Sequence, residues 1–113
     1  MAVLNNVSLL SEVEQLVLLG VLKLDIGGDA YAVPVRALVL KDTGINLPRG
    51  SVYVTLERLE QKGLIHSWMT EPIAMKGGKA RRVFGVRPAG MRALRVATRA
   101  MTKMMAGTAL AKG

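Results

Sequence analysis

The sequence predicts a mainly α-helical domain that carries one small β-hairpin, and three observations support this fold class. Apolar residues recur at three- and four-residue spacing in four separate stretches, which is the period of a helix. Between the third and fourth stretches, two strand-like runs flank a turn-rich segment that contains Pro72 and Gly77-Gly78. The 113 residues contain no internal repeat and match the length of a single domain.

The first helix is expected from Ser11 to about Leu24. Ser11-Glu12-Val13-Glu14 fits a capping box, in which the serine covers free amides of the first turn and Glu14 reaches back. The helix is apolar on nearly all sides, so it should be buried on nearly all sides. We therefore expect it to serve both the core and a subunit contact, the latter through Leu16 and Leu19. Residues 1–10 show no clear period.

The second helix should begin just after Tyr31. Pro34 then falls in the first turn, where a missing N–H group costs little. Val35, Leu38 and Val39 would form the buried face, and Thr43-Gly44 ends the helix.

The third helix lies within residues 47–65, which read LPRGSVYVTLERLEQKGLI. Ser51 is a possible N-cap, and Val52, Leu56 and Leu59 recur at helical spacing, so that face should join the core. The helix should stop at Gly63. A polar, partly basic face is left pointing outward.

A hairpin should follow, with strands at Leu64–Thr70 and Ala80–Val86 and a basic tip at Glu71–Lys79. Trp68 and Phe84 are expected to pack with each other or under the hairpin.

Pro88 then opens a last helix that runs from Ala89 to near Ala106, with a frayed tail to Gly113. We therefore divide the chain into residues 1–87, a winged helix-turn-helix DNA-binding domain by its element order, and residues 88–113, a C-terminal dimerisation helix and tail. Leu94, Ala97, Met101 and Met104 repeat along this helix and are the expected dimer contacts. Arg92, Arg95, Arg99 and Lys103 form a basic stripe on it.

Charge is distributed unevenly along the chain. Residues 1–45 contain three basic and five acidic side chains, whereas residues 46–113 contain thirteen basic and three acidic ones. Between Lys76 and Lys103 there are nine basic residues and no acid. A field of one sign on half of a small domain indicates a polyanionic partner, either nucleic acid or an anionic membrane surface.

Composition excludes several other classes. Cysteine is absent, so there is no disulfide framework and no thiolate ligand, and a lone His66 makes no metal site. Neither a nucleophile with a base nor a phosphate loop assembles, so we expect no enzyme, no cofactor and no metal. No apolar run is long enough to span a bilayer, and the default is a cytoplasmic protein. Hydrophobic residues make up 50% of the chain, and there are 12 glycines in addition. In an ordinary soluble domain, hydrophobic residues and glycine together make up only roughly 45–50%. This excess calls for a second buried surface, most simply a homodimer interface.

The motifs resemble those of the PadR-like transcriptional regulators. The resemblance rests on Tyr31 opening the second helix, the segment GSVYVTLERLEQKGLI at residues 50–65, the Gly-Gly pair followed by basic residues at 77–82, and Pro-Ala-Gly at 88–90. It covers residues 9–97. The resemblance implies a homodimeric repressor that binds double-stranded DNA, with the last helix, and often the first, at the subunit interface.

The expected DNA contacts fall into two groups. In the third helix, Gln61 suits adenine and Arg58 suits guanine, Val54 can touch a thymine methyl group, and Arg49 and Ser51 lie where a helix start favours phosphate. Tyr53 is either a phosphate contact or a packed ring. The full sets are Arg49, Ser51, Tyr53, Val54, Arg58, Gln61 and Lys62 in the helix, and Lys76, Gly77, Gly78, Lys79, Arg81 and Arg82 in the wing.

Two other classes of function remain open from the sequence. One is a protein-interaction module that keeps the winged fold without binding DNA. The other is a membrane-surface protein that uses the basic last helix. A small-molecule effector is possible, but no aromatic residue in the last helix supports one.

Overall fold

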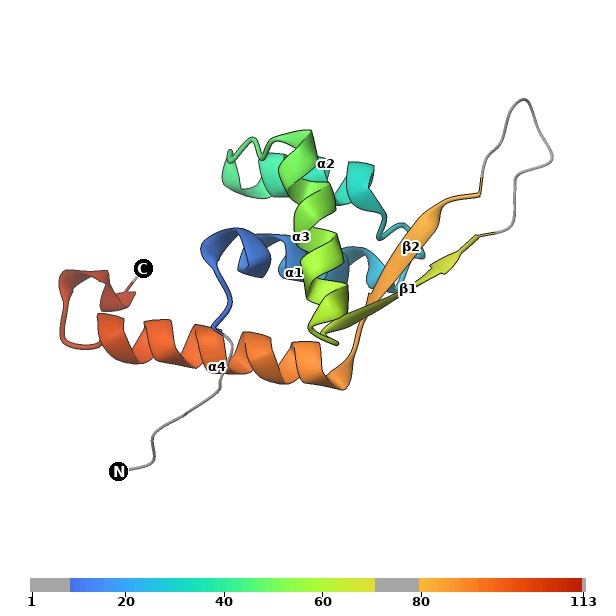
Figure 1. Cartoon of the computed structure of the whole chain (residues 1–113). Helices are drawn as coiled ribbons and strands as arrows, with labels where there is room; N and C mark the ends of the chain where they lie inside the picture. The colour runs from blue at the N-terminus through green and yellow to red at the C-terminus, as the bar shows by residue number, and fades with distance from the viewer. Residues whose placement is uncertain (1–8, 71–79, 113) are drawn as a thin grey trace.

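The computed structural model describes residues 9–70 and 80–112, and within these ranges the predicted fold class is confirmed (Figure 1). Three helices are followed by an antiparallel hairpin and a long last helix. The elements are α1 (Glu12–Asp25), α2 (Ala32–Thr43), α3 (Arg49–Gln61), β1 (Ile65–Met69), β2 (Arg82–Val86), α4 (Pro88–Met105) and a terminal 3-10 turn, η1 (Ala109–Lys112).

Helix α1 is the centre of the core. The predicted capping box is present: the Glu14 amide donates to Ser11 Oγ at 3.1 Å, and the Ser11 amide donates to Glu14 Oε1 at 2.9 Å. Val17, Leu18 and Val21 are completely buried against the other elements. Because α1 packs on α2, α3, β2 and α4, it gives α3 and the hairpin a common support.

A short turn joins α2 to α3. Gly44 adopts a left-handed conformation, with φ of 77°, and its amide donates to the carbonyl of Leu40, as a glycine C-cap does. Arg36 braces the turn by donating to the Leu47 carbonyl at 2.6 Å and to Asn46 Oδ1 at 3.0 Å. This brace holds the start of α3 against α2.

The start of α3 differs from the expectation. The helix begins at Arg49, directly after Pro48, so Ser51 lies inside the first turn and is not the N-cap. The predicted buried face is confirmed, because Val52, Leu56 and Leu59 are each no more than 1% exposed.

The hairpin pairs Ile65 with Val86 at its base and Met69 with Arg82 at its outer end. Phe84 is buried, whereas Trp68 is 44% exposed, and Trp68 lies opposite Val83 in the ladder. Side chains alternate between the two faces of a strand, so Trp68 and Phe84 lie on opposite faces, and the predicted contact between them is wrong. The Trp68 ring instead lies 5.2 Å from the ring of His66.

Helix α4 starts in the core and then leaves it. Gly90 and Leu94 are buried, but the C-terminal half of the helix extends past the end of α1 with mainly exposed side chains (Figure 1). The expected frayed tail is wrong for residues 109–112, which form the turn η1.

Candidate nucleic-acid interface

The outward face of α3 carries the side chains that the sequence selected. Tyr53 is 51% exposed and Val54 is 49% exposed, and Arg58 and Gln61 are also exposed. The buried face of the same helix fixes this orientation, because Val52, Leu56 and Leu59 face the core. An exposed valine flanked by long polar side chains matches a surface that contacts base edges in a groove.

The N-terminal end of α3 suits an anion. Among the described residues, no side chain caps the first turn, which leaves the amides of Arg49, Gly50 and Ser51 available. Arg49 is exposed at this end. Free amides, the positive end of the helix dipole and a guanidinium group together favour a phosphate.

Arg81 stands at the root of the wing. Its guanidinium carbon lies 4.7 Å from the centroid of the Tyr31 ring, a cation–π contact between the hairpin and the start of α2. Its backbone pairs with Thr70: the Thr70 amide donates to the Arg81 carbonyl at 2.8 Å, and the Arg81 amide donates to Thr70 Oγ1 at 2.9 Å. Lys76, Gly77, Gly78 and Lys79, which were predicted at the wing tip, lie outside the described residues.

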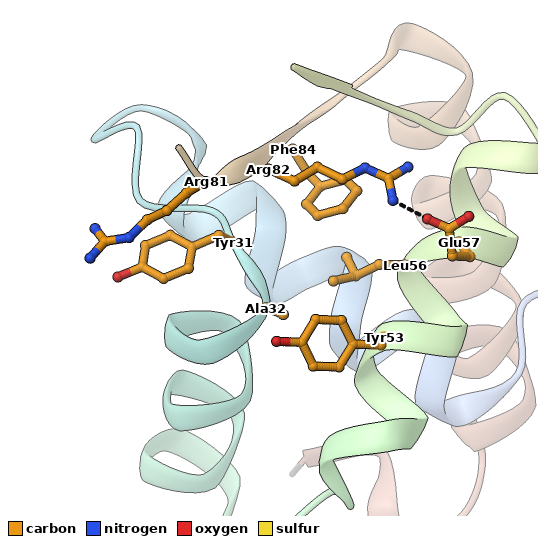
Figure 2. A pocket seen from close by; sticks show the side chains of 8 residues that line it. All are labelled: Tyr31, Ala32, Tyr53, Leu56, Glu57, Arg81, Arg82 and Phe84. Atoms are coloured by element: carbon orange, nitrogen blue, oxygen red, sulfur yellow. Dashed lines mark hydrogen bonds and ion pairs between the residues drawn. The ribbon is translucent and has the colours of Figure 1, made fainter. Parts of the chain in front are cut away.

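A hollow of about 290 Å³ lies between α3, the start of α2 and the wing root (Figure 2). Tyr31 and Tyr53 flank it from opposite sides, and the Tyr53 ring extends from α3 toward α2. Tyr53 is therefore partly packed and partly exposed. The hollow is lined by Tyr31, Ala32, Tyr53, Leu56, Glu57, Arg81, Arg82 and Phe84.

Tyr31 and Arg36 were not among the predicted site residues. Tyr31 flanks the hollow and supports Arg81, and Arg36 holds the turn before α3. The match of Tyr31 to the family pattern was a signal that could have placed it here. No local sequence signal marks Arg36, because its partners lie 10 and 11 residues away.

Arg82 has partners on α3. Its guanidinium group forms ion pairs with Glu57 and Glu60, donates to Ser67 Oγ at 3.1 Å, and lies 5.1 Å from the centroid of the Phe84 ring. The hydrogen bond with Glu57 raises the pKa of Arg82. Partial burial opposes deprotonation of Glu60, but hydrogen bonds from Ser67 and Arg82 outweigh it and hold the pKa of Glu60 below its usual range.

Lys62 also has a partner inside the domain. Its Nζ atom lies 2.6 Å from Glu14 Oε2, so the end of α3 is tied to the start of α1. Burial acts to raise the pKa of Glu14, but Lys62 and the capping bonds with Ser11 prevail and lower it. The ammonium group of Lys62 is thus paired within the domain, at the C-terminal end of α3.

Replacing Glu14 with glutamine should destabilise the fold by about 1–3 kcal/mol at neutral pH, because it removes the partner of Lys62 and weakens the capping box. Since the pKa of Glu14 is lower in the folded than in the unfolded chain, its charge stabilises the fold above the unfolded value, roughly 4.3. That contribution is lost as pH falls through the folded pKa. Urea unfolding at pH 7 and at successively lower pH should show the wild-type advantage over E14Q shrinking. An equal gap at all pH values would contradict this role for Glu14.

The residues expected at a dimer interface fall into two groups. Leu16 and Leu19 line a shallow groove between α1 and α2. In α4, Leu94 is buried within its own chain and Ala97 is half-buried, while Met101 and Met104 are 56% and 76% exposed. Met101, Met104 and, to a smaller extent, Leu19, which is 39% exposed, therefore leave apolar surface for a partner.

The described residues show no group of three or more histidine, cysteine or acidic side chains that could hold a metal ion. Among them, no helix is long and apolar enough to cross a bilayer. An exposed helix face, an open helix N-terminus and a basic wing root on one side of the domain together define a winged helix-turn-helix DNA-binding protein.

The comparison with known families agrees with this class of protein and identifies one family within it. The model of the transcriptional regulator PadR-like family matches residues 21–96. The chain belongs to this family of DNA-binding transcriptional regulators. A search of the curated proteins gave no significant match.

Solved structures share the fold. A PadR family transcription regulator from Clostridium difficile R20291 is 23% identical, with a TM-score of 0.67 over 84% of this chain and 95% of the other. A transcriptional regulator from Clostridium thermocellum is 20% identical, with a TM-score of 0.65 over 81% and 84% of the two chains. A PadR family regulator from Eggerthella lenta is 26% identical, with a TM-score of 0.51 over 80% and 83%. All three of these proteins are transcription regulators.

Proposed function

We propose that this protein is a transcriptional repressor that binds a palindromic operator as a homodimer. The observation that carries the proposal is the exposed face of α3, which lies beside a basic wing root on a domain of the PadR-like family. A repressor of this kind acts on chromosomal DNA, so we propose a cytoplasmic location.

Each part of the surface has a distinct role in the proposal. Gln61 and Arg58 read base edges in the major groove, and Val54 contacts a thymine methyl group. Arg49, with the amides up to Ser51, positions the helix on a phosphate, and the hydroxyl of Tyr53 contacts the backbone. Arg81 contacts the flanking backbone, together with the wing-tip residues Lys76, Gly77, Gly78 and Lys79.

Dimerisation is assigned to α1 and to the C-terminal half of α4. Met101 and Met104 project from a part of α4 where most side chains are exposed, and Leu19 of α1 is 39% exposed. Adaptable methionine side chains suit such a contact. In a dimer, the two copies of α3 would reach successive major grooves about 34 Å apart, which requires a palindromic site.

Light scattering at micromolar concentration should give the mass of a dimer. The double variant M101E/M104E should be a monomer, because four buried carboxylates would each lose hydration at the interface. The variant M69E is a matched control, since Met69 is 61% exposed on the hairpin; it should remain a dimer. A monomeric wild-type protein would contradict the assignment.

Selection of bound fragments from genomic DNA tests the function itself. The account predicts enrichment of fragments that share an inverted repeat, and transcription from an adjacent promoter should fall when the protein is added. Fragments recovered without any common sequence would contradict sequence-specific binding. A winged protein-interaction module would retain no duplex at all, and the charge-neutral variant R81Q would leave its partner binding intact.

A further inference from the structure

The hairpin formed by β1 and β2 is connected to α3 through Arg82, at the outer end of the strand pair. Met69 and Arg82 form the last pair of the hairpin, and both are exposed, whereas Ile65 and Phe84 nearer the base are buried. In Figure 1, the outer end of the described strands extends away from the three-helix body of the domain. Buried apolar packing therefore ends at Val83 and Phe84, just before this pair.

The side chain of Arg82 makes the connection that packing does not. Each nitrogen of its guanidinium group has a different partner: Nε donates to Ser67, Nη1 to Glu57 and Nη2 to Glu60. Ser67 also donates to Glu60, at 2.7 Å. The two carboxylates are three residues apart on α3 and so lie on one helix face. We call these four side chains the Arg82 cluster.

The charges in the cluster disfavour a direct role for Arg82 on DNA. Two carboxylates surround one guanidinium group, and the side chain of Glu57 is 49% exposed. A phosphate that approached Arg82 would displace these partners and meet their negative charge. The guanidinium group of Arg81, in contrast, lies over the neutral ring of Tyr31. Within residues 9–70 and 80–112, Arg81 forms no ion pair with an acidic side chain.

We propose that Arg82 is a positioning residue that fixes the angle between the hairpin strands β1 and β2 and α3, and that it does not contact DNA. The proposal rests on the DNA-binding function proposed above. Two adjacent arginines thus have different roles. Arg81 contacts the DNA backbone, whereas the charge of Arg82 is neutralised by Glu57 and Glu60. The proposal also explains why α3, which faces a polyanion, carries two acidic residues.

Affinity for duplex DNA, measured at several salt concentrations, separates this role from a phosphate contact. R82Q should lose about three- to tenfold in affinity, the scale of one or two partly exposed ion pairs, with no change in salt slope. R82K should lose nearly as much, since a lysine cannot satisfy three partners in a fork. E57Q/E60Q should also bind more weakly, although it removes negative charge from the DNA-facing side. The triple variant should be no worse than R82Q. R81Q is the matched control, and it should lower the slope by about 1.8 per dimer.

A phosphate contact predicts the opposite pattern. E57Q/E60Q would then bind DNA more tightly because Arg82 is released, R82K would bind almost like the wild type, and R82Q would lower the salt slope as R81Q does. That set of results would overturn the proposal.

Trp68 gives a readout that needs no DNA. It is the single tryptophan of the chain and lies on β1, one ladder step from Arg82. Time-resolved fluorescence anisotropy of the free protein should show a larger amplitude of internal motion in R82Q and in E57Q/E60Q than in the wild type or R81Q. Unchanged anisotropy in both variants would refute the positioning role. Failure of the wild type to bind any duplex would instead refute the proposed function, and the anisotropy would still decide the role of Arg82.

Discussion

Replacing Arg58 with alanine is expected to weaken operator binding on the order of a hundredfold, because a bidentate arginine–guanine contact contributes about 1–3 kcal/mol and a dimer would make two. The loss should be specific to sequence. Wild-type protein should discriminate strongly at one position of each half-site, and R58A should accept all four base pairs there. Titrations with a set of operators that are substituted one position at a time measure both effects.

Arg92 supplies the control for this experiment. It is exposed on the first half of α4, outside the helix that carries Arg58, and its removal changes the net charge by the same amount. R92A should bind slightly more weakly to every duplex, without altered discrimination. Equal losses in R58A and R92A, with discrimination unchanged in both, would show that Arg58 acts only through its charge.

Replacing Gly90 with alanine is expected to destabilise the protein by about 2–3 kcal/mol, the upper range for overpacking a tight contact. A Cβ atom at Gly90 would overlap the carbonyl oxygen of Leu64 and lie 2.9 Å from Val86 Cγ1. The carbonyl of Leu64 cannot move freely, because it accepts a hydrogen bond of 2.9 Å from the Arg87 amide. The first turn of α4 would have to separate from the hairpin base. Urea unfolding measures the difference.

Gly50 is the matched control for Gly90. Both glycines lie in the first turn of a helix, but at Gly50 a Cβ atom would meet no described atom within 4 Å other than its chain neighbours and the backbone of its own helix. G50A should be neutral or stabilising by up to about 1 kcal/mol, because alanine favours a helix over glycine. Equal stability of G90A and the wild type would contradict the close approach of α4 to the hairpin.

The parts of the fold that local patterns determine could be predicted. The capping box at Ser11 and the left-handed Gly44 after α2 involve residues only a few positions apart, so the sequence contains all of the partners. The apolar face of α3 follows from its helical period alone. The outward face was therefore predictable as well, since it is what the period leaves exposed.

The parts that depend on distant partners could not be predicted. Lys62 and Glu14 are 48 residues apart, and Arg82 lies 25 residues from Glu57, so nothing local shows that these cations are paired within the domain. Counting charges in the sequence does not distinguish Lys62 and Arg82, which form ion pairs within the domain, from Arg81, which lies over the Tyr31 ring. Ser51 was assigned as a cap because serine favours that position, but Pro48 starts the helix earlier through its fixed φ angle.

Packing by α4 was also only partly visible in the sequence. Leu94 and Met101 belong to the same apolar stripe, so periodicity assigned both to a dimer contact. In the structure, Leu94 is buried in its own chain, while Met101 is exposed beyond the end of the core. The position at which α4 leaves the domain depends on the length of α1 beneath it, which no pattern within α4 encodes.

The salt dependence of operator affinity tests the central claim most directly. Arg49 and Arg81, together with the wing-tip residues Lys76 and Lys79, would give about eight phosphate contacts from two protomers. Affinity should then fall by about a thousandfold or more between 50 and 200 mM salt, with a linear dependence of log K on log salt concentration. Fluorescence anisotropy with a labelled operator measures this slope. Binding that does not respond to salt, or no binding to any duplex at low salt, would contradict the account.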